Sequence, residues 1–408
     1  MKNGTSFDIA VVGTGPAGLA AALALAGLGA RVVAIGAATV NRDTRTAALF
    51  GGSITLLDNL GVGEVCRQAG EPITGIRIID DMGSLLRAPE VTFTATEADL
   101  ERFGYNVPNA CLVEALRVRA GELPRLTLLD ANVGEIVVGD TGAEIHLADG
   151  RALAAKLIVG ADGRQSLCRQ AAQIPVKTWT YEQSALACTF AHQRPHGGIS
   201  TEFHRPAGPF TVVPSRGNTS SLVWVERPDV AKELAALDET GFRPALERRL
   251  QGMLGAVGNI GPRGVFPLTG MAAQTAGRNR VALVGEAVHV IPPIGAQGLN
   301  LGLRDAACLA DCVADALASG ADIAAPAVLE AYGRMRRTDI TSRIWTVDLL
   351  NRSLLSSAAP VQALRGIGLH ILKNVGPLRR FAMREGLGPS FIAPRLMQPP
   401  TSAAAPSP

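Results

Sequence analysis

The chain has 408 residues, a net charge of +3, 45 glycines and an aromatic content of only 4%. This length can bury the cores of two or three domains, and so small a charge excludes the strongly basic surface typical of nucleic-acid-binding proteins. We therefore expect no nucleic-acid partner. The six cysteines are scattered without CxxC pairs, so we expect reduced thiols in a cytoplasmic protein and no metal site.

Residues 9–30 carry no charge and are long enough to span a bilayer. However, Gly13, Gly15 and Pro16 divide the run into a short strand-like piece and an Ala/Leu helix, and a second strand-like run follows at residues 31–35. This pattern predicts one buried βαβ unit rather than a membrane span or a signal peptide.

The turn of this unit has the sequence Gly13-Thr14-Gly15-Pro16-Ala17-Gly18. A GxGxxG turn between a strand and a helix lets backbone N–H groups face a pyrophosphate with no Cβ in the way, so we predict dinucleotide binding. The Asp or Glu expected about 20 residues further on, for a ribose hydroxyl, is absent. The strand ends Ile35-Gly36-Ala37-Ala38, and Asp43 is the nearest carboxylate. The ribose contact therefore stays open.

Later segments alternate between two patterns. Residues 76–99 form short β-like pieces, whereas 107–120 have helical spacing and 125–159 give further strands. Residues 178–277 contain β-like stretches around one polar helix, and 278–318 return to a strand, a Pro/Gly loop and a long Ala/Leu helix. We infer a nucleotide-binding domain interrupted twice by a sheet-based domain.

Two later motifs indicate that the dinucleotide is FAD rather than NAD, because the longer flavin dinucleotide needs contacts beyond the first turn. One is Gly160-Ala161-Asp162-Gly163, which follows a strand. The other spans residues 280–306, where a strand ends at Gly285-Glu286, a Pro/Gly loop follows, and a helix is predicted to begin near Leu299. The N-terminus of that helix suits an electron-rich group such as the flavin pyrimidine edge.

These three motifs, in this order and spacing, resemble the single-component flavin hydroxylases of the para-hydroxybenzoate hydroxylase class over nearly the whole chain. The run from Gln297 to Asp305, with PFTVVP, SSLVWVE and REGLGPS, is similar to the ubiquinone-biosynthesis branch. The resemblance implies an FAD-dependent monooxygenase that hydroxylates an aromatic ring, a polyprenylated phenol intermediate, through a flavin C4a-hydroperoxide formed with O2. Glu286 departs from the family, which has Asp there, but it keeps a carboxylate for a ribityl hydroxyl.

The expected fold class is α/β, with a discontinuous Rossmann-like FAD-binding domain, an interrupting β-sheet substrate domain and a C-terminal helical segment. The predicted FAD-binding parts are 1–75, 100–177 and 278–340, the substrate-domain parts are 76–99 and 178–277, the helical region is 341–396, and the disordered tail is 397–408.

The resemblance also implies roles for particular residues. Arg45 would hold the FAD diphosphate or ribose, Asp162 would organise the site, and Asn109 would lie beside the cofactor, although a helix N-cap explains Asn109 nearly as well. The full set expected to bind FAD is Gly13, Gly15, Pro16, Ala17, Gly18, Arg45, Asn109, Asp162, Gly163, Gly285, Glu286, Pro293, Gly295, Gln297, Gly298, Leu299 and Asn300. No catalytic residue is evident; His289, the one histidine within a flavin motif, is either a proton relay or a structural imidazole.

Several functional alternatives remain open. No second GxGxxG follows a later strand, so NAD(P)H either binds transiently at the flavin face or is replaced by a partner protein that supplies electrons. A flavin-dependent reductase or dehydrogenase would share the cofactor motifs without inserting oxygen. A non-catalytic flavoprotein subunit of a biosynthetic complex is a further alternative.

Residues 341–396 contain eight Lys and Arg residues and two acidic residues, a balance of +6. Interleaved with apolar runs, this excess favours peripheral contact with an anionic inner membrane surface, or docking of a partner subunit. A helix packed on the core with a basic outer face is an equally good interpretation.

Overall fold

The computed structural model describes residues 5–37, 43–83, 88–355, 368, 370, 374–387 and 393–399. The first of its two large sheets comprises β1 (Thr5–Val12), β2 (Val32–Ile35), β8 (Leu126–Leu129), β9 (Val133–Val138), β10 (Ala143–Leu147), β11 (Ala152–Gly160), β18 (Gly277–Arg278) and β19 (Val281–Leu283). The strand order is β18-β19-β11-β1-β2-β8, and β10 and β9 extend from β11 as an antiparallel pair. Because β1 pairs in parallel with both β11 and β2, its central residues are buried on both faces of the sheet.

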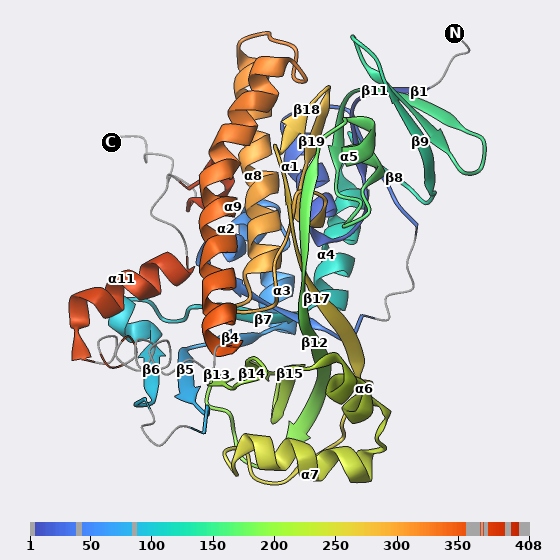
Figure 1. Cartoon of the computed structure of the whole chain (residues 1–408). Helices are drawn as coiled ribbons and strands as arrows, with labels where there is room; N and C mark the ends of the chain where they lie inside the picture. Colours follow the sequence, from blue (N-terminus) through green and yellow to red (C-terminus); the bar gives the residue numbers. More distant parts are fainter. Residues whose placement is uncertain are drawn as a thin grey trace, which may run out of the picture.

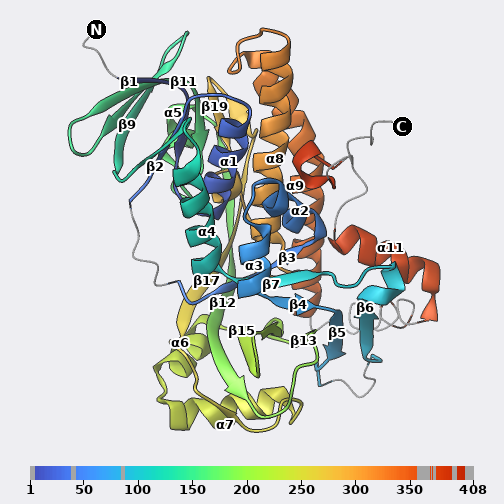
Figure 2. The same ribbon diagram turned by 180° about the vertical axis from the view of Figure 1, so that it is seen from behind.

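Helices cover this first sheet (Figure 1). They include α1 (Pro16–Gly27), α4 (Asn109–Glu122), α5 (Leu167–Ala171), α8 (Gln297–Ala318) and α9 (Pro326–Leu355). The α1 helix packs against both α4 and α8, and α8 packs against α9; Figure 2 shows α4 beside α1 from behind. The uncharged run 9–30 is thus the end of β1 and α1, and α1 is buried along most of its length. Within the described residues, no helix combines the length and apolar character needed to cross a membrane.

The second sheet has nine strands: β5 (Gly75–Asp80), β6 (Val91–Thr94), β12 (Val176–His192), β13 (Ile199–His204), β14 (Phe210–Ser215), β15 (Thr219–Glu226), β16 (Val257–Gly258), β17 (Gly264–Ala273) and β20 (His289–Val290). Their order is β20-β17-β12-β15-β14-β13-β5-β6, with β16 on β12. On one face Phe203, Phe210 and Trp224 form a chain of edge-to-face ring contacts that continues to Phe242 of α7 (Glu239–Leu250). That face, with α6 (Pro228–Ala236) nearby, lies toward the end of the molecule that is farthest from the first sheet (Figure 1).

Smaller elements complete the described fold. They are a three-stranded sheet of β3 (Thr46–Phe50), β7 (Gly104–Pro108) and β4 (Glu71–Ile73), the helices α2 (Gly51–Asn59), α3 (Gly63–Ala69) and α11 (Gly376–Leu387), and the 3₁₀ turns η1 (Ala95–Ala98), η2 (Gly285–Ala287) and η3 (Arg395–Met397).

The predicted α/β class is confirmed, with helices over one sheet and a second sheet inserted between its strands. The division into domains stays a prediction. Five of its six boundaries fall inside elements, since they divide β5 at 75/76, β12 at 177/178, β18 at 277/278, α9 at 340/341 and the 3₁₀ turn η3 at 396/397. The tail predicted from residue 397 lies outside the described residues after residue 399.

Candidate active site

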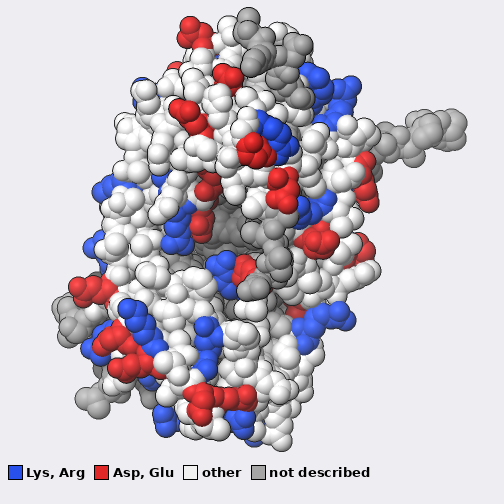
Figure 3. Space-filling view, turned by 90° about the vertical axis from the view of Figure 1, so that its right-hand side faces the viewer, with Lys and Arg blue, Asp and Glu red and all other residues white. Residues whose placement is uncertain are grey.

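A single cavity of 1120 Å³ extends from the loops of the first sheet to one face of the second. It is lined by the GxGxxG turn, the loop after β19, alternate side chains of the second sheet and part of α9. Figure 3 shows a hollow in the middle of one side of the molecule, with acidic and basic side chains near its edge. Most of the predicted FAD-binding residues line the cavity: Gly15, Pro16, Ala17, Gly18, Arg45, Asn109, Gly163, Gly285, Glu286, Pro293, Gly295, Gln297, Gly298 and Leu299.

The glycines of the first turn have different tasks. A Cβ on Gly13 would lie 2.2 Å from the Ala161 carbonyl oxygen, and one on Gly18 would lie 2.0 Å from that of Gly13. Both glycines therefore permit close packing of strand, helix and neighbouring loop. A Cβ on Gly15 would meet no protein atom within 4 Å. Gly15 is also the N-cap of α1, without a side-chain cap, so open space lies directly before the helix N-terminus, where an anionic group binds well.

Asp162 does not line the cavity, in contrast to Gly163 beside it. Its carboxylate accepts hydrogen bonds from Ser166 Oγ at 2.6 Å and from the Cys168 N–H at 3.1 Å. Asp162 therefore shapes the turn into α5, and its predicted role is limited to organising the loop.

A cluster of polar side chains lines the cavity close to the start of α4. Asp43 accepts hydrogen bonds from Arg45 Nε at 2.7 Å and from Asn109 Nδ2 at 3.0 Å. Burial raises the pKa of Asp43, but these bonds outweigh burial and hold the pKa below its ordinary value. The Arg45 guanidinium also lies 5.0 Å from the centre of the Phe266 ring.

Asn109 lines the cavity and does not cap α4. The N-cap of α4 is Pro108, so the alternative of an Asn109 N-cap is wrong. The Asn109 Oδ1 atom is buried and has no hydrogen-bond partner among the described residues. Such an oxygen is costly to leave unsatisfied, and Asn109 lines the cavity.

The third motif places a second helix N-terminus at the cavity. The α8 helix begins at Gln297, two residues before the predicted start, because Ala296 adopts a left-handed conformation with φ of 54° and serves as the N-cap. Glu286 is exposed and forms a 3.1 Å ion pair with Arg164. Its carboxylate thus lies at the rim of the cavity.

Asn300 lies behind this helix N-terminus and does not line the cavity. Its Oδ1 accepts from the Phe50 N–H at 3.1 Å and from Ser53 Oγ at 2.7 Å, and its Nδ2 donates to the Ala48 carbonyl at 2.8 Å. The side chain of Asn300 therefore joins α8 to the start of α2, which corrects the expectation of a direct cofactor contact. Gly13 likewise shapes the site without lining it.

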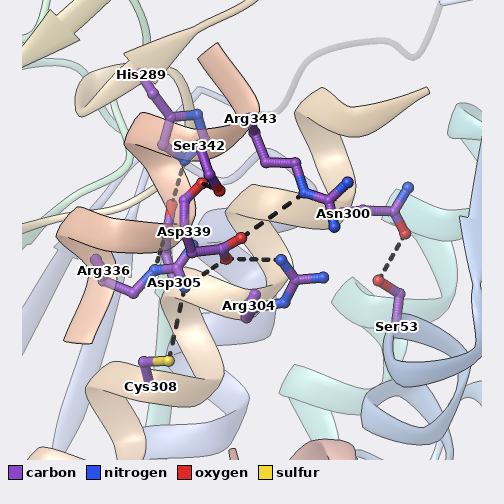
Figure 4. A network of polar contacts seen from close by, with 10 residues as sticks. All are labelled: Ser53, His289, Asn300, Arg304, Asp305, Cys308, Arg336, Asp339, Ser342 and Arg343. Carbon is purple, nitrogen blue, oxygen red and sulfur yellow. Dashed lines mark hydrogen bonds and ion pairs between the residues drawn. The ribbon is translucent and has the colours of Figure 1, made fainter. Parts of the chain in front are cut away.

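A buried network of charged side chains, which the sequence motifs did not predict, holds the flavin-motif loop (Figure 4). Asp305 is fully buried and accepts from His289 Nε2 at 2.8 Å, from the Gly285 N–H at 2.9 Å and from Arg336 Nε at 2.6 Å. Burial raises the pKa of Asp305, but the charges of His289 and Arg336 and the hydrogen bonds lower it to about 2. Asp339 continues the network by accepting from Arg336.

His289 therefore has a clear structural role, because it fixes the loop through Asp305. It also lines the cavity, so the proton-relay hypothesis stays a prediction. Among the described residues, no group of three or more His, Cys, Asp or Glu side chains is arranged to hold a metal ion.

The C-terminal region borders the cavity. Arg343, Thr346, Val347 and Leu350 line it from one stripe of α9, at the i, i+3, i+4 and i+7 spacing of a helix face. In α11, Arg379 forms an ion pair with Glu97, and its guanidinium lies 4.6 Å from the centre of the Phe93 ring. Part of the basic excess of this region is thus used in internal contacts.

The described residues fit FAD. The Gly15 turn leaves room at one helix N-terminus, and α8 supplies another. Arg45 offers positive charge, and the unpaired Asn109 oxygen offers a hydrogen-bond acceptor. An extended ligand with a diphosphate, an electron-rich ring and sugar hydroxyls suits this combination of donors and acceptor.

Comparisons with known proteins agree with this fit. A family model described as an FAD binding domain matches residues 6–344. The chain is 37% identical to ubiquinone hydroxylase UbiL of Rhodospirillum rubrum, covering 96% of this chain and 92% of the relative. It is 30% identical to 3-demethoxyubiquinol 3-hydroxylase of Escherichia coli, covering 93% and 98%. The fold resembles p-nitrophenol 4-monooxygenase PnpA of Pseudomonas putida, with a TM-score of 0.78 at 21% identity over 95% of this chain and 100% of that one. The predicted resemblance is confirmed: the chain belongs to the family of FAD-dependent hydroxylases that includes the ubiquinone-biosynthesis monooxygenases.

Proposed function

We propose that this protein hydroxylates the aromatic ring of a polyprenylated phenol in ubiquinone biosynthesis, with O2 as co-substrate. The observation that carries the proposal is the continuity of the cavity, which joins the FAD-motif loops to a largely apolar chamber over the second sheet. Ile73, Phe93 and Phe103 belong to the buried apolar cluster of this chamber. An aromatic ring with an apolar chain suits such a lining, and the named activities of the relatives support this substrate class.

The chain's own residues would bind, orient and shield. FAD, when bound, supplies the oxygen-transfer chemistry. The helix N-terminus of α8 and the loop held by Asp305 would fix the flavin end, while Arg45 and Asn109 would hold the dinucleotide along the wall. The apolar chamber would exclude water from the reacting ring, which protects reactive species from hydrolysis.

The test is oxygen insertion. Purified FAD-loaded protein would be supplied with NADH or NADPH, isotopically labelled O2 and a prenylated phenol, and the product examined by mass spectrometry. Label in a new ring hydroxyl supports the proposal. Substrate oxidation without label would favour the reductase or dehydrogenase alternative, and a protein that takes up no FAD would favour the non-catalytic alternative. If neither nicotinamide bleaches the flavin while a chemical reductant does, a partner protein supplies the electrons.

We also infer that the C-terminal region meets an anionic membrane surface, where a polyprenylated substrate resides. Trp345 and Leu349 of α9, one helical turn apart, have exposed fractions of 71% and 69%. A Trp beside exposed apolar and basic residues suits a membrane interface. Arg380 is exposed, whereas Arg379 is engaged with Glu97 and contributes less to such a surface.

A further inference from the structure

Strand β13 presents polar side chains to the cavity. Alternate residues of a strand point to opposite faces, and here Phe203 packs in the aromatic core beneath the sheet, whereas Glu202 and His204 line the cavity. The same alternation brings apolar and small side chains of the neighbouring strands to the cavity face. These are Ile76 and Ile78 of β5, Val213 of β14, and Ser221 and Val223 of β15.

Glu202 and His204 form a hydrogen-bonded pair in this apolar setting. His204 Nε2 lies 2.9 Å from Glu202 Oε1, and Thr211 Oγ1 donates to Glu202 Oε2 at 3.2 Å. The side chains of His204 and Glu202 are 3% and 13% exposed. The other ring nitrogen, His204 Nδ1, is buried and has no hydrogen-bond partner among the described residues. A buried, unsatisfied nitrogen is costly, and a ligand in the cavity would remove that cost.

The pair and the flavin-motif loop line the same cavity. In the strand register Glu202 is opposite Ile78 on one side and Thr211 on the other. Ile78 packs in the same apolar cluster as Ala296, the N-cap of α8. One chamber therefore contains both the end of the flavin loop and the polar pair.

We propose that His204 accepts the proton of the substrate's ring hydroxyl and that Glu202 is its positioning residue; this rests on the proposed function. Because a carboxylate only accepts hydrogen bonds, Nε2 carries the proton toward Glu202, and the neutral imidazole offers Nδ1 as an acceptor. The phenolic O–H bond breaks, its proton bonds to Nδ1, and its electron pair stays on the oxygen, which makes the ring more electron-rich. The Glu202 carboxylate balances the charge of the imidazolium.

Other charged groups surround the pair. Asp80 on β5 lies opposite His204 in the register, and its carboxylate accepts a hydrogen bond from the Ala88 N–H at 2.8 Å. Arg205 pairs with Asp81 at 2.8 Å. Ligand ionisation by the parent and the variants is therefore compared at one fixed pH, so that the charges of these neighbours stay the same.

The test uses a prenylated nitrophenol, whose visible absorption reports its ionisation. It is bound to the FAD-loaded protein at a pH below the probe's own pKa. In the parent we expect the spectrum of the phenolate, whereas in His204→Gln and Glu202→Gln the bound probe should stay protonated. With a substrate phenol, kcat should fall about a hundredfold in His204→Gln, with a much smaller change in KM. The loss should shrink for more acidic phenols, because these need less help to ionise. Thr211→Val removes only the Thr211 hydrogen bond to Glu202 and should give an intermediate effect. This variant keeps the test valid if the larger changes impair folding.

The chain offers a matched control on β10. Glu144 and His146 have the same spacing, but lie 3.9 Å apart with side chains that are 57% and 42% exposed. Glu144→Gln and His146→Gln should leave both the probe spectrum and kcat unchanged. The inference is overturned if His204→Gln ionises the probe as the parent does, or if kcat falls equally for all phenols. In that case, continued insertion of labelled oxygen would leave the proposed function intact; a parent that ionises the probe but inserts no oxygen would instead refute the proposed function.

Discussion

Replacing Asp305 with Asn should both destabilise the protein and loosen its flavin loop. The Asp305 carboxylate is completely buried and accepts hydrogen bonds from His289, Arg336 and the Gly285 N–H. Asparagine has a similar shape but no charge. The substitution would therefore leave the guanidinium of Arg336, only 1% exposed, with one carboxylate fewer beside it.

Two arguments set the size of the effect. Breaking one partner of a buried ion pair typically costs about 3–5 kcal/mol. Independently, a fall of the Asp305 pKa from 3.8 to about 2 corresponds to about 2 kcal/mol of folding stability at neutral pH. Because the folded-state pKa is the lower one, this contribution is complete above the unfolded pKa and is lost as the pH falls from about 4 toward 2. We expect the free energy of unfolding to fall by about 2–5 kcal/mol at pH 7.

The assay is urea unfolding of the parent and Asp305→Asn, with and without saturating FAD, together with an FAD titration followed by flavin fluorescence. FAD affinity should fall as well, because the Gly285 N–H loses its charged acceptor. Asp149→Asn is the control, since Asp149 pairs with Arg151 at the surface, with side chains 46% and 51% exposed, and its loss should change the stability little. Equal stability of Asp305→Asn and the control would refute the reasoning.

Three further outcomes are expected. Gly15→Val should fold normally, because a Cβ there meets no protein atom within 4 Å, yet it should lose FAD; normal FAD affinity measured by equilibrium dialysis would contradict the proposed binding turn. Glu286→Ala should weaken FAD binding about tenfold to a hundredfold by loss of a charged hydrogen bond, whereas Glu286→Asp should be tolerated. The melting temperature should change little, because the ion pair of Glu286 with Arg164 is exposed. Unchanged FAD affinity of the alanine variant would mean that Glu286 points elsewhere. Replacing Trp345 and Leu349 by Ser should reduce co-sedimentation with anionic liposomes while leaving FAD content unchanged, and the membrane inference fails if the double variant sediments like the parent at every salt concentration.

The residues predicted to bind FAD could be proposed from the sequence because local chain geometry determines which residue types a binding turn needs. The turn from Gly13 to Gly18 needs glycine where a Cβ would clash or fill ligand space, and those needs appear as a motif of six residues. The start of α8 was predicted two residues late, because nothing in the identity of Ala296 indicates its left-handed conformation.

Long-range contacts could not be predicted in this way. Arg379 was counted as part of a basic surface, but its partner Glu97 lies 282 residues away in the chain. Asp305 was recognised only as a member of a motif. Its ion pair with Arg336 could not be predicted, because that pair depends on how α9 packs on α8. The alternation of β13 is visible in the sequence, but the direction in which Glu202 and His204 point depends on the position of the aromatic core.

The cofactor half and the substrate half of the cavity use different parts of the chain. This difference explains why only the cofactor half can be recognised from a sequence motif. In the proposed binding mode, FAD would be held largely by backbone groups at the N-termini of α1 and α8, so the residues needed there are those that permit a particular backbone shape. The phenol would instead meet side chains on one face of a sheet whose other face carries the aromatic core. Because side chains on opposite faces of a strand are independent, residues such as Glu202 can change without disturbing Phe203 beside it. A fold of this kind can keep one cofactor site while the aromatic ring that it recognises changes. The residues that determine the substrate are therefore expected on the cavity face of β13 and β14 rather than in the glycine motifs.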